Sequence, residues 1–237
     1  MTPARLERRL AEAAADYYRP NGRGVYYSVR NKLGQDPAFA AILAHGLIRD
    51  GARVLDLGCG RGLLPSWLRA ARSAYDQEEW CEEWPAPPRA VHVRGVEHHA
   101  NSLDQARRAL GDTTAFELGD ILDSDFAGAD TVVLLDVLHY MDPNAQHAVL
   151  ERIGRALPDD GVLILRVGDA AAGLRFRFSR WVDQAVLLAR GDGWSGLHCR
   201  SLSDWRAALL GHGFTSQIVP LPKRAFSADV LLLARPQ

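Results

Sequence analysis

A short apolar run that leads into three closely spaced glycines most constrains the fold of this chain. Residues 54–62 read VLDLGCGRG, and Leu63 then opens a predicted helix. Glycine lets the backbone turn sharply and lets a ligand approach main-chain atoms where a Cβ would collide. In doubly wound α/β sheets, ligands bind beyond the carboxyl ends of the strands, next to a turn of this kind. The segment therefore predicts an α/β fold with a nucleotide-like ligand at the turn.

Short β-rich apolar runs alternate with helical stretches along most of the chain. The predicted strands are 53–57, 91–97, 115–118, 131–136, 161–167, 215–221 and 228–234. The predicted helices are 3–16, 37–48, 63–71, 102–110, 144–157, 174–189 and 203–210. This alternation is typical of a parallel sheet with helices on both faces, and the short link between the last two strands favours an antiparallel edge hairpin. We therefore expect a doubly wound, mostly parallel seven-stranded sheet.

Charge, cysteine content and hydropathy exclude several classes of function. The 28 basic and 29 acidic residues give a net charge of −1, which argues against nucleic acid as a partner. Cys59, Cys81 and Cys199 are far apart and form no CxxC pair, so we expect neither a disulfide framework nor a structural zinc site. The longest apolar runs are far shorter than the ~20 residues that cross a bilayer, and no secretion signal opens the sequence. We expect a cytoplasmic protein without stable membrane insertion.

The position of the glycines distinguishes two kinds of nucleotide-like ligand. Dinucleotide-binding folds use GxGxxG, whereas residues 58–63 read GCGRGL. Asp56 precedes the first glycine by two residues, and its carboxylate would repel a pyrophosphate but attract an ammonium or sulfonium group. We therefore expect a cationic ligand beside the turn. S-adenosylmethionine, which carries both a sulfonium and an amino group, meets this requirement.

The segment starting at Asp56 resembles the first motif of the class I S-adenosylmethionine-dependent methyltransferases, DxGxGxG, with Gly58, Gly60 and Gly62 at the glycine positions. The resemblance extends over roughly residues 50–170. It implies a Rossmann-like methyltransferase fold and S-adenosylmethionine as the cofactor. It also implies that Asp56, Gly58, Cys59 and Gly60 bind that cofactor.

The same resemblance assigns roles to residues that follow the next three predicted strands. Glu97, which ends the string GVE, matches the acid that holds both ribose hydroxyls, and His98 is expected beside it. Asp120, in GDIL, matches the residue that accepts a hydrogen bond from the adenine amino group, and Ile121 would flank the ring. Asp136, in LLDVLHYMDP, matches the segment that lines the methyl-transfer site. The alternative for each acid is a helix cap or a solvated loop group.

Methyl transfer from a sulfonium is an in-line displacement that mainly needs donor and acceptor aligned in a dry pocket, and it requires no metal. A base helps when the acceptor is a hydroxyl or an amine that loses a proton. His139 is the first candidate because histidine titrates near neutral pH, and Tyr140 and Asp136 are weaker candidates. The alternative for His139 is a structural histidine bonded to the backbone.

Substrate recognition is expected in segments added to the family's core. We expect residues 1–50 to form a helical cap or lid that includes a loop with Pro20, Gly22 and Gly24. Residues 51–237 are expected to form a single methyltransferase domain, with an insertion at 73–89 that tryptophans anchor. A further lid helix is expected from Leu174.

Two short sequence segments indicate the chemical class of the methyl acceptor. RVGDAAAGLRFR and LHCR are similar to methyltransferases associated with bacterial aryl-polyene or lipid-like pigment pathways. This similarity implies a small-molecule acceptor with an aromatic or acyl group, carried in some cases on an acyl carrier protein, and leaves both O- and C-methylation open. Two other functions also stay open: a nicotinamide-dependent dehydrogenase, which the glycine spacing disfavours, and a catalytically inactive methyltransferase-like binding protein.

Overall fold

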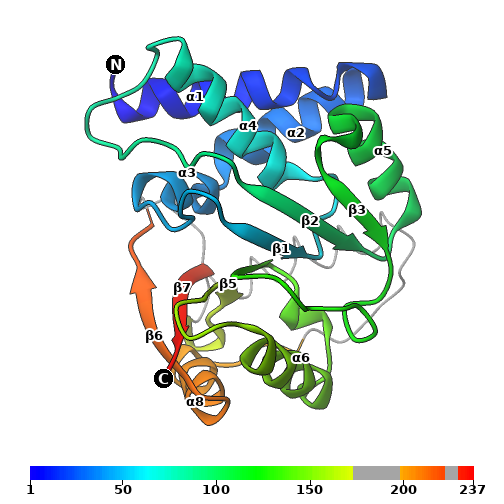
Figure 1. Ribbon diagram of the computed structural model, residues 1–237, viewed down its shortest axis with the longest axis vertical. Helices are drawn as coiled ribbons and strands as arrows, with labels where there is room; N and C mark the ends of the chain where they lie inside the picture. Colours follow the sequence, from blue (N-terminus) through cyan, green and yellow to red (C-terminus); the bar gives the residue numbers. More distant parts are fainter. Residues whose placement is uncertain (173–197, 222–228) are drawn as a thin grey trace. The chain divides into compact units, whose positions relative to one another are not determined.

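The computed structural model describes residues 1–172, 198–221 and 229–237. Its seven strands are ordered β3-β2-β1-β4-β5-β7-β6 (Figure 1). The strands are β1 (Arg53–Leu57), β2 (His92–Glu97), β3 (Ala115–Leu118), β4 (Thr131–Leu135), β5 (Val162–Gly168), β6 (Phe214–Val219) and β7 (Asp229–Pro236). The α-helices are α1 (Pro3–Asp16), α2 (Arg23–Gln35), α3 (Pro37–Ala44), α4 (Leu63–Asp76), α5 (Ala100–Leu110), α6 (Pro143–Ala156) and α8 (Leu202–Gly211). The expected seven-stranded, mostly parallel sheet with an antiparallel hairpin at one edge is confirmed.

The chain divides into two compact units, Met1–Val132 and Val133–Gln237, with the boundary inside β4. In the first unit, β1, β2 and β3 are parallel, and Leu57, the last residue of β1, lies beside Val96, the residue before the end of β2. Leu55, Leu57 and Val96 are almost completely buried, as expected for strands covered by helices. Because parallel strands end at the same edge, the loops after β1, β2 and β3 gather there.

The expected loop at Gly22 and Gly24 is wrong in part, because residues 23–35 form helix α2. Gly22 has a φ of 91° and precedes the helix, so the turn that it predicts is present but short. Only Val29 and Leu33 of α2 are buried, which leaves a weak helical pattern in the sequence. Helix α2 packs against α1 (Figure 1), and this tertiary packing stabilises the helix despite its weak amphipathic pattern.

Tyr18, just after α1, anchors the N-terminal helices to the glycine turn. Its side chain is fully buried, and its hydroxyl lies within donating distance of the backbone carbonyls of Arg61 (2.7 Å) and Gly62 (2.9 Å). Nearby, the Asn21 side-chain amide donates to the carbonyl of Gln105 in α5 at 2.9 Å. Burial raises the pKa of Tyr18, so the phenol stays protonated and remains a donor.

The segment predicted as an insertion is partly helical. Helix α4 continues to Asp76, beyond the predicted end at residue 71. After α4, Cys81 and Trp84 are buried, and the Trp80 indole donates to the carbonyl of Pro85 at 3.1 Å. The Trp80 and Trp84 rings meet edge to face with their centroids 6.0 Å apart. The two tryptophans therefore hold this excursion in a folded conformation.

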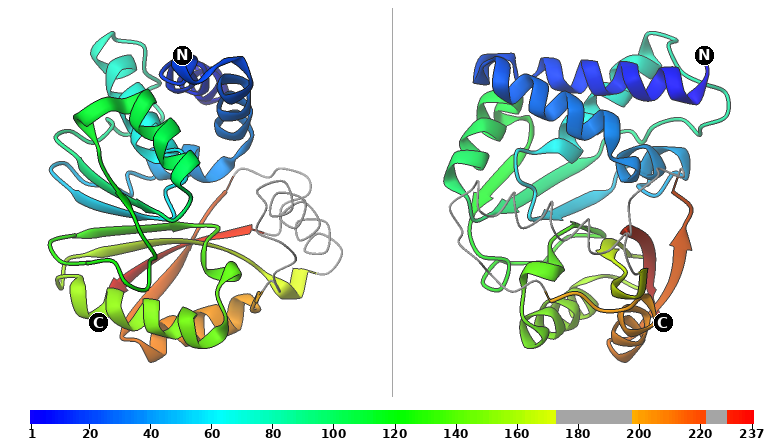
Figure 2. Two further views of the ribbon diagram at one scale, coloured as in Figure 1. Left: turned by 90° about the vertical axis from the view of Figure 1, so that its right-hand side faces the viewer. Right: turned by 180° about the vertical axis from the view of Figure 1, so that it is seen from behind.

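In the second unit, β7 pairs with both β5 and β6 in antiparallel fashion. Helices α6 and α8 lie next to each other on one face of these strands (Figure 2). Asp142 caps α6 as expected, accepting from the backbone N–H groups of Asn144 and Ala145. The helix predicted at 174–189 lies outside the described residues. Within the described ranges, no helix is both long and apolar enough to span a bilayer.

Replacing Tyr18 by phenylalanine tests the anchor. The variant leaves buried carbonyls without their donor, so we expect the free energy of unfolding to fall by about 1 kcal/mol. Urea denaturation measures this change. The matched control is Tyr27→Phe, which alters a half-exposed phenol and should leave the free energy of unfolding within about 0.5 kcal/mol. Equal stabilities of the two variants would contradict the anchor role.

Candidate cofactor site

The glycine turn after β1 is fastened to the end of β2 by backbone hydrogen bonds. The N–H groups of Gly58 and Cys59 both donate to the carbonyl of Val96, at 2.8 and 3.0 Å. Gly58 and Gly60 have φ angles of 74° and 57°, in the left-handed region that favours glycine. These contacts give the turn one defined conformation at the carboxyl edge of the strands.

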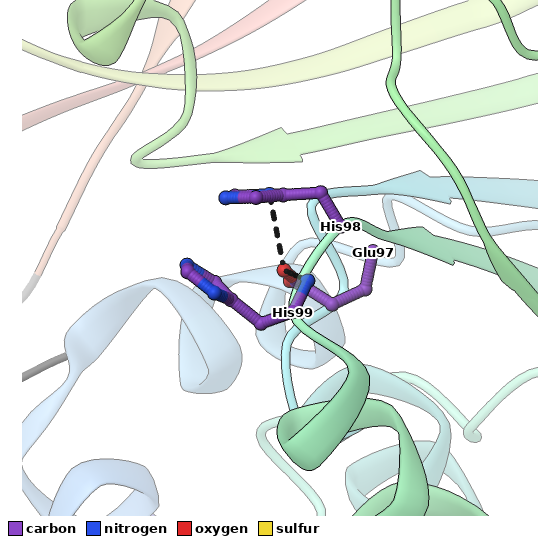
Figure 3. Close-up of side chains that lie close together, drawn as sticks. All are labelled: Glu97, His98 and His99. Atoms are coloured by element: carbon purple, nitrogen blue, oxygen red, sulfur yellow. Dashed lines mark hydrogen bonds and ion pairs between the residues drawn. The ribbon is translucent and has the colours of Figure 1, made fainter. Parts of the chain in front are cut away.

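Glu97 completes this attachment through its side chain. It is buried, and its Oε2 accepts a hydrogen bond from the N–H of Gly60 at 2.8 Å. Its Oε1 accepts from the N–H of His99 at 2.9 Å and lies 3.2 Å from Nδ1 of His98 (Figure 3). A carboxylate has about four acceptor positions, so capacity for a vicinal diol remains. The insertion before β2 has therefore not moved Glu97 away from the turn.

Asp56 and Cys59 are the other buried groups of the turn. Burial, together with the nearby Glu97 carboxylate, raises the pKa of Asp56 to about 7. Burial likewise raises the pKa of the Cys59 thiol, with Asp56 and Glu97 acting in the same direction, so this cysteine stays protonated. A cation at this edge would stabilise the ionised carboxylates. The electrostatics of the turn thus favour a positively charged ligand.

The end of β3 joins the same edge. The N–H of Gly119 donates to the backbone carbonyl of Glu97 at 3.1 Å. Asp120 follows with an exposed side chain, and its Oδ1 accepts from the N–H of Leu122 at 2.8 Å, while Ile121 is buried. The predicted residues after β1, β2 and β3 therefore lie at one continuous edge of the first unit.

Asp136 belongs to the second unit, where its half-buried side chain forms an ion pair with the buried Arg166. It has a φ of 61°, a conformation that non-glycine residues adopt rarely. Arg166 contacts both carboxylate oxygens, with its Nε 2.6 Å from Oδ1 and an Nη nitrogen against Oδ2. A carboxylate held by a guanidinium is a poor proton acceptor. Sequence reasoning missed Arg166, although an arginine inside the apolar string VLILRVG is a signal for a buried partner.

His139 lies in a short 3-10 helix of the second unit, Leu138–Tyr140. Its side chain is buried, and its Nε2 has no hydrogen-bond partner among the residues that the structure describes. Burial lowers the pKa of His139, with Arg166 lowering it further and Asp136 opposing both, so the imidazole is neutral at neutral pH. The ring centroid of Tyr140 lies 4.1 Å away. A neutral imidazole with an available nitrogen is able to accept a proton.

Gln146, which sequence reasoning also missed, fixes the loop that carries His139. This buried side chain donates to the carbonyls of Leu138 at 2.9 Å and of His198 at 2.8 Å. Its Oε1 accepts from Nε of Arg200 at 2.7 Å. Two of its partners, His198 and Arg200, lie more than 50 residues along the chain, so no local sequence pattern marks it.

A glycine turn at the carboxyl ends of parallel strands, bordered by buried carboxylates, defines an α/β protein of the nucleoside-binding class. Residues 10–216 match the family model described as a methyltransferase domain. The chain belongs to this family, the class I S-adenosylmethionine-dependent methyltransferases, as its sequence motifs implied. The cofactor of the family is S-adenosylmethionine.

The chain is also similar in sequence to two proteins whose names refer to S-adenosyl-L-methionine. A carboxy-S-adenosyl-L-methionine synthase from Chromohalobacter salexigens is 31% identical over 56% of this chain and 46% of that protein. The chain thus aligns with about half the length of that relative. A synthase of the same name from Pseudomonas fluorescens is 28% identical over 76% of this chain and 75% of the relative.

The fold is also similar to solved methyltransferases. The magnesium protoporphyrin IX methyltransferase ChlM from Synechocystis, with bound SAH, has a TM-score of 0.59 at 20% identity and covers 94% of both chains. The mitomycin 7-O-methyltransferase MmcR has a TM-score of 0.61 at 20% identity, over 93% of this chain and 60% of that one. At these identities the likeness supports the fold.

The raised pKa of Asp56 predicts a pH-dependent stability in the protein without cofactor. The folded state binds the Asp56 proton more tightly than the unfolded state, whose reference pKa is 3.8. This contribution to stability is full below that pKa and is lost as the pH rises through about 7. We expect Asp56→Asn to gain stability over the wild type between pH 4 and pH 8, by up to about 4 kcal/mol, because one pKa unit corresponds to about 1.4 kcal/mol.

Urea denaturation at several pH values measures this difference. Asp50→Asn is the control. Hydrogen bonds from Arg89 lower the pKa of the exposed Asp50, so this substitution should change the pH dependence of stability in the opposite direction. A difference in the free energy of unfolding between the wild type and Asp56→Asn that stays constant across this pH range would contradict a raised pKa of Asp56 in the folded protein.

Proposed function

We propose that this chain binds S-adenosylmethionine at the carboxyl edge of β1, β2 and β3 and transfers its methyl group to a small-molecule acceptor. The observation that carries the proposal is the hydrogen bond from Gly60 to the buried Glu97 carboxylate, 2.8 Å long. It places an acceptor for ribose hydroxyls directly beside a turn that a main-chain ligand can approach. Family membership supports the donor.

Each group at this edge has a proposed role toward the donor. Glu97 holds the ribose hydroxyls, with His98 beside it, and Asp56 attracts the positively charged amino acid part. Gly58, Cys59 and Gly60 present the main chain. Asp120 accepts from the adenine amino group, and Ile121 packs on the ring. Asp136, in the second unit, remains a predicted cofactor residue on the basis of the sequence resemblance.

Two substitutions test this assignment. We expect Asp56→Ala and Glu97→Ala each to weaken S-adenosylmethionine binding by ~1–3 kcal/mol, which is the range for unpairing a buried polar contact. Isothermal titration calorimetry measures the affinity. Asp50→Ala, at an exposed carboxylate of the same unit, is the control that should bind as the wild type does. Wild-type affinity in both test variants would reject the pocket.

His139 is the proposed base for an acceptor that loses a proton, and Tyr140 is the second candidate. His139 is buried and its pKa lies below the usual histidine range. Its imidazole should therefore be unprotonated at neutral pH, and kcat should decline only in more acidic solution. Histidine is not needed in this role if the acceptor atom is a carbon.

Replacing His139 by glutamine distinguishes these cases. For an oxygen or nitrogen acceptor we expect kcat to fall about 100-fold with little change in the KM of the donor, since a positioned base contributes about 10²- to 10⁴-fold. Steady-state kinetics with radiolabelled donor provide the readout, and His147→Gln, at an exposed histidine, is the matched control. An unchanged kcat with such an acceptor would eliminate His139 as the base.

We also propose that the acceptor is aromatic or acyl in nature, free or carried on an acyl carrier protein. This rests on the resemblance of RVGDAAAGLRFR and LHCR, parts of which lie outside the described residues. A screen of metabolite extracts with donor labelled in its methyl group, followed by mass spectrometry, identifies the product. Label on a compound of another class would refute this part of the proposal.

The sequence relatives favour a second candidate function. Two of them are named carboxy-S-adenosyl-L-methionine synthase, which describes modification of the donor itself. The same screen separates the two candidates. Methyl transfer moves a label on the methyl carbon to an acceptor and leaves S-adenosylhomocysteine. Donor carboxylation needs a carboxyl-donating co-reactant, replaces one hydrogen of the methyl group, which leaves as a proton, and keeps the carbon label on a sulfonium of higher mass.

A further inference from the structure

Three potential metal ligands follow one another at the end of β2. The carboxylate of Glu97 and one ring nitrogen each from His98 and His99 all lie within 4.8 Å of one another. Their side chains project in the same direction from the strand end (Figure 3). The two imidazole rings lie with centroids 3.9 Å apart. A single ion is able to contact all three groups after small rotations of the side chains.

One separation in this cluster is close to that in a zinc site. Ligand atoms of a tetrahedral zinc ion lie ~3.4 Å apart, because each bond is about 2.1 Å long. The Nδ1 of His98 and the Oε1 of Glu97 are 3.2 Å apart. The His98 side chain is 67% exposed, so it is able to adjust toward an ion at little cost. Glu97 is buried and held by two backbone N–H groups, so it offers one fixed ligand.

The chemistry of the three groups selects a class of ion. Two imidazole nitrogens and one carboxylate oxygen suit zinc, cobalt, nickel or copper better than magnesium or calcium, which prefer oxygen ligands. Three protein ligands leave at least one position for water, which is the arrangement of an open rather than a structural site. The water molecule at that position would exchange with solvent.

We propose that Glu97, His98 and His99 form a site for a divalent transition-metal ion, and that an ion bound there excludes the adenosyl donor. The second part rests on the proposed function, in which Glu97 holds the ribose. The two oxygens of Glu97 already accept from Gly60 and His99. An ion on Oε1 would take a lone pair that the diol requires, so ribose and metal compete for one carboxylate.

Zinc titration of the metal-free, full-length protein, in competition with a chromophoric chelator and without donor, tests the site directly. We expect His99→Gln to weaken zinc binding at least about tenfold, since even partners outside the ligand shell change metal affinity by about 10- to 100-fold. His147→Gln is the matched control, because His147 and His212 form another close pair, 2.9 Å apart, and it should bind zinc as the wild type does. Equal zinc affinity in wild type and His99→Gln would overturn the site.

Calorimetry of S-adenosylmethionine with and without zinc tests the exclusion, with each variant as its own reference. At zinc ten times its dissociation constant, we expect the apparent Kd of the donor to rise about tenfold in the wild type and less in His99→Gln. An unchanged Kd in the wild type would overturn the exclusion. A metal-free wild type that binds no donor would instead refute the proposed function, while the chelator titration still decides the metal site.

Discussion

The hydrogen bond between the N–H of Gly60 and the buried carboxylate of Glu97 is the interaction on which the account of this site depends. It joins the turn after one strand to the end of the next, and it fixes an acceptor where a ribose would lie. The backbone hydrogen bonds from Gly58 and Cys59 to the carbonyl of Val96 also join the turn to the end of β2. Because the carboxylate is buried and held by two backbone N–H groups, its position is fixed.

The same burial makes negative charge at this edge unfavourable. Asp56 and Glu97 are both buried at one edge of the first unit, and burial together with the Glu97 carboxylate raises the pKa of Asp56. A cationic ligand would stabilise the ionised carboxylates, whereas a diphosphate would add further repulsion. The charge of the edge therefore favours a cationic ligand over an anionic one. A transition-metal ion bound to Glu97 would also neutralise this carboxylate and would occupy one of its lone pairs, which is why metal and donor are expected to compete.

Local patterns were sufficient to predict most strands and to single out residues that the structure places around the glycine turn. Asp56 and Gly58 lie in one strand–turn segment, and Glu97 ends an apolar run, so each stands out within a few residues. Helix α2 escaped prediction because only Val29 and Leu33 are buried on it. Arg166 and Gln146 escaped for a different reason: their partners, Asp136 and His198, are distant in sequence. Contacts of that kind are set by tertiary packing and leave little trace in a single sequence.

A crystal structure of the protein with S-adenosylhomocysteine tests the central claim most directly. The account predicts the ribose hydroxyls within hydrogen-bond distance of the Glu97 carboxylate and the amino acid part of the ligand toward Asp56. A ligand bound away from the glycine turn, or a turn that instead holds a diphosphate beside Glu97, would contradict it.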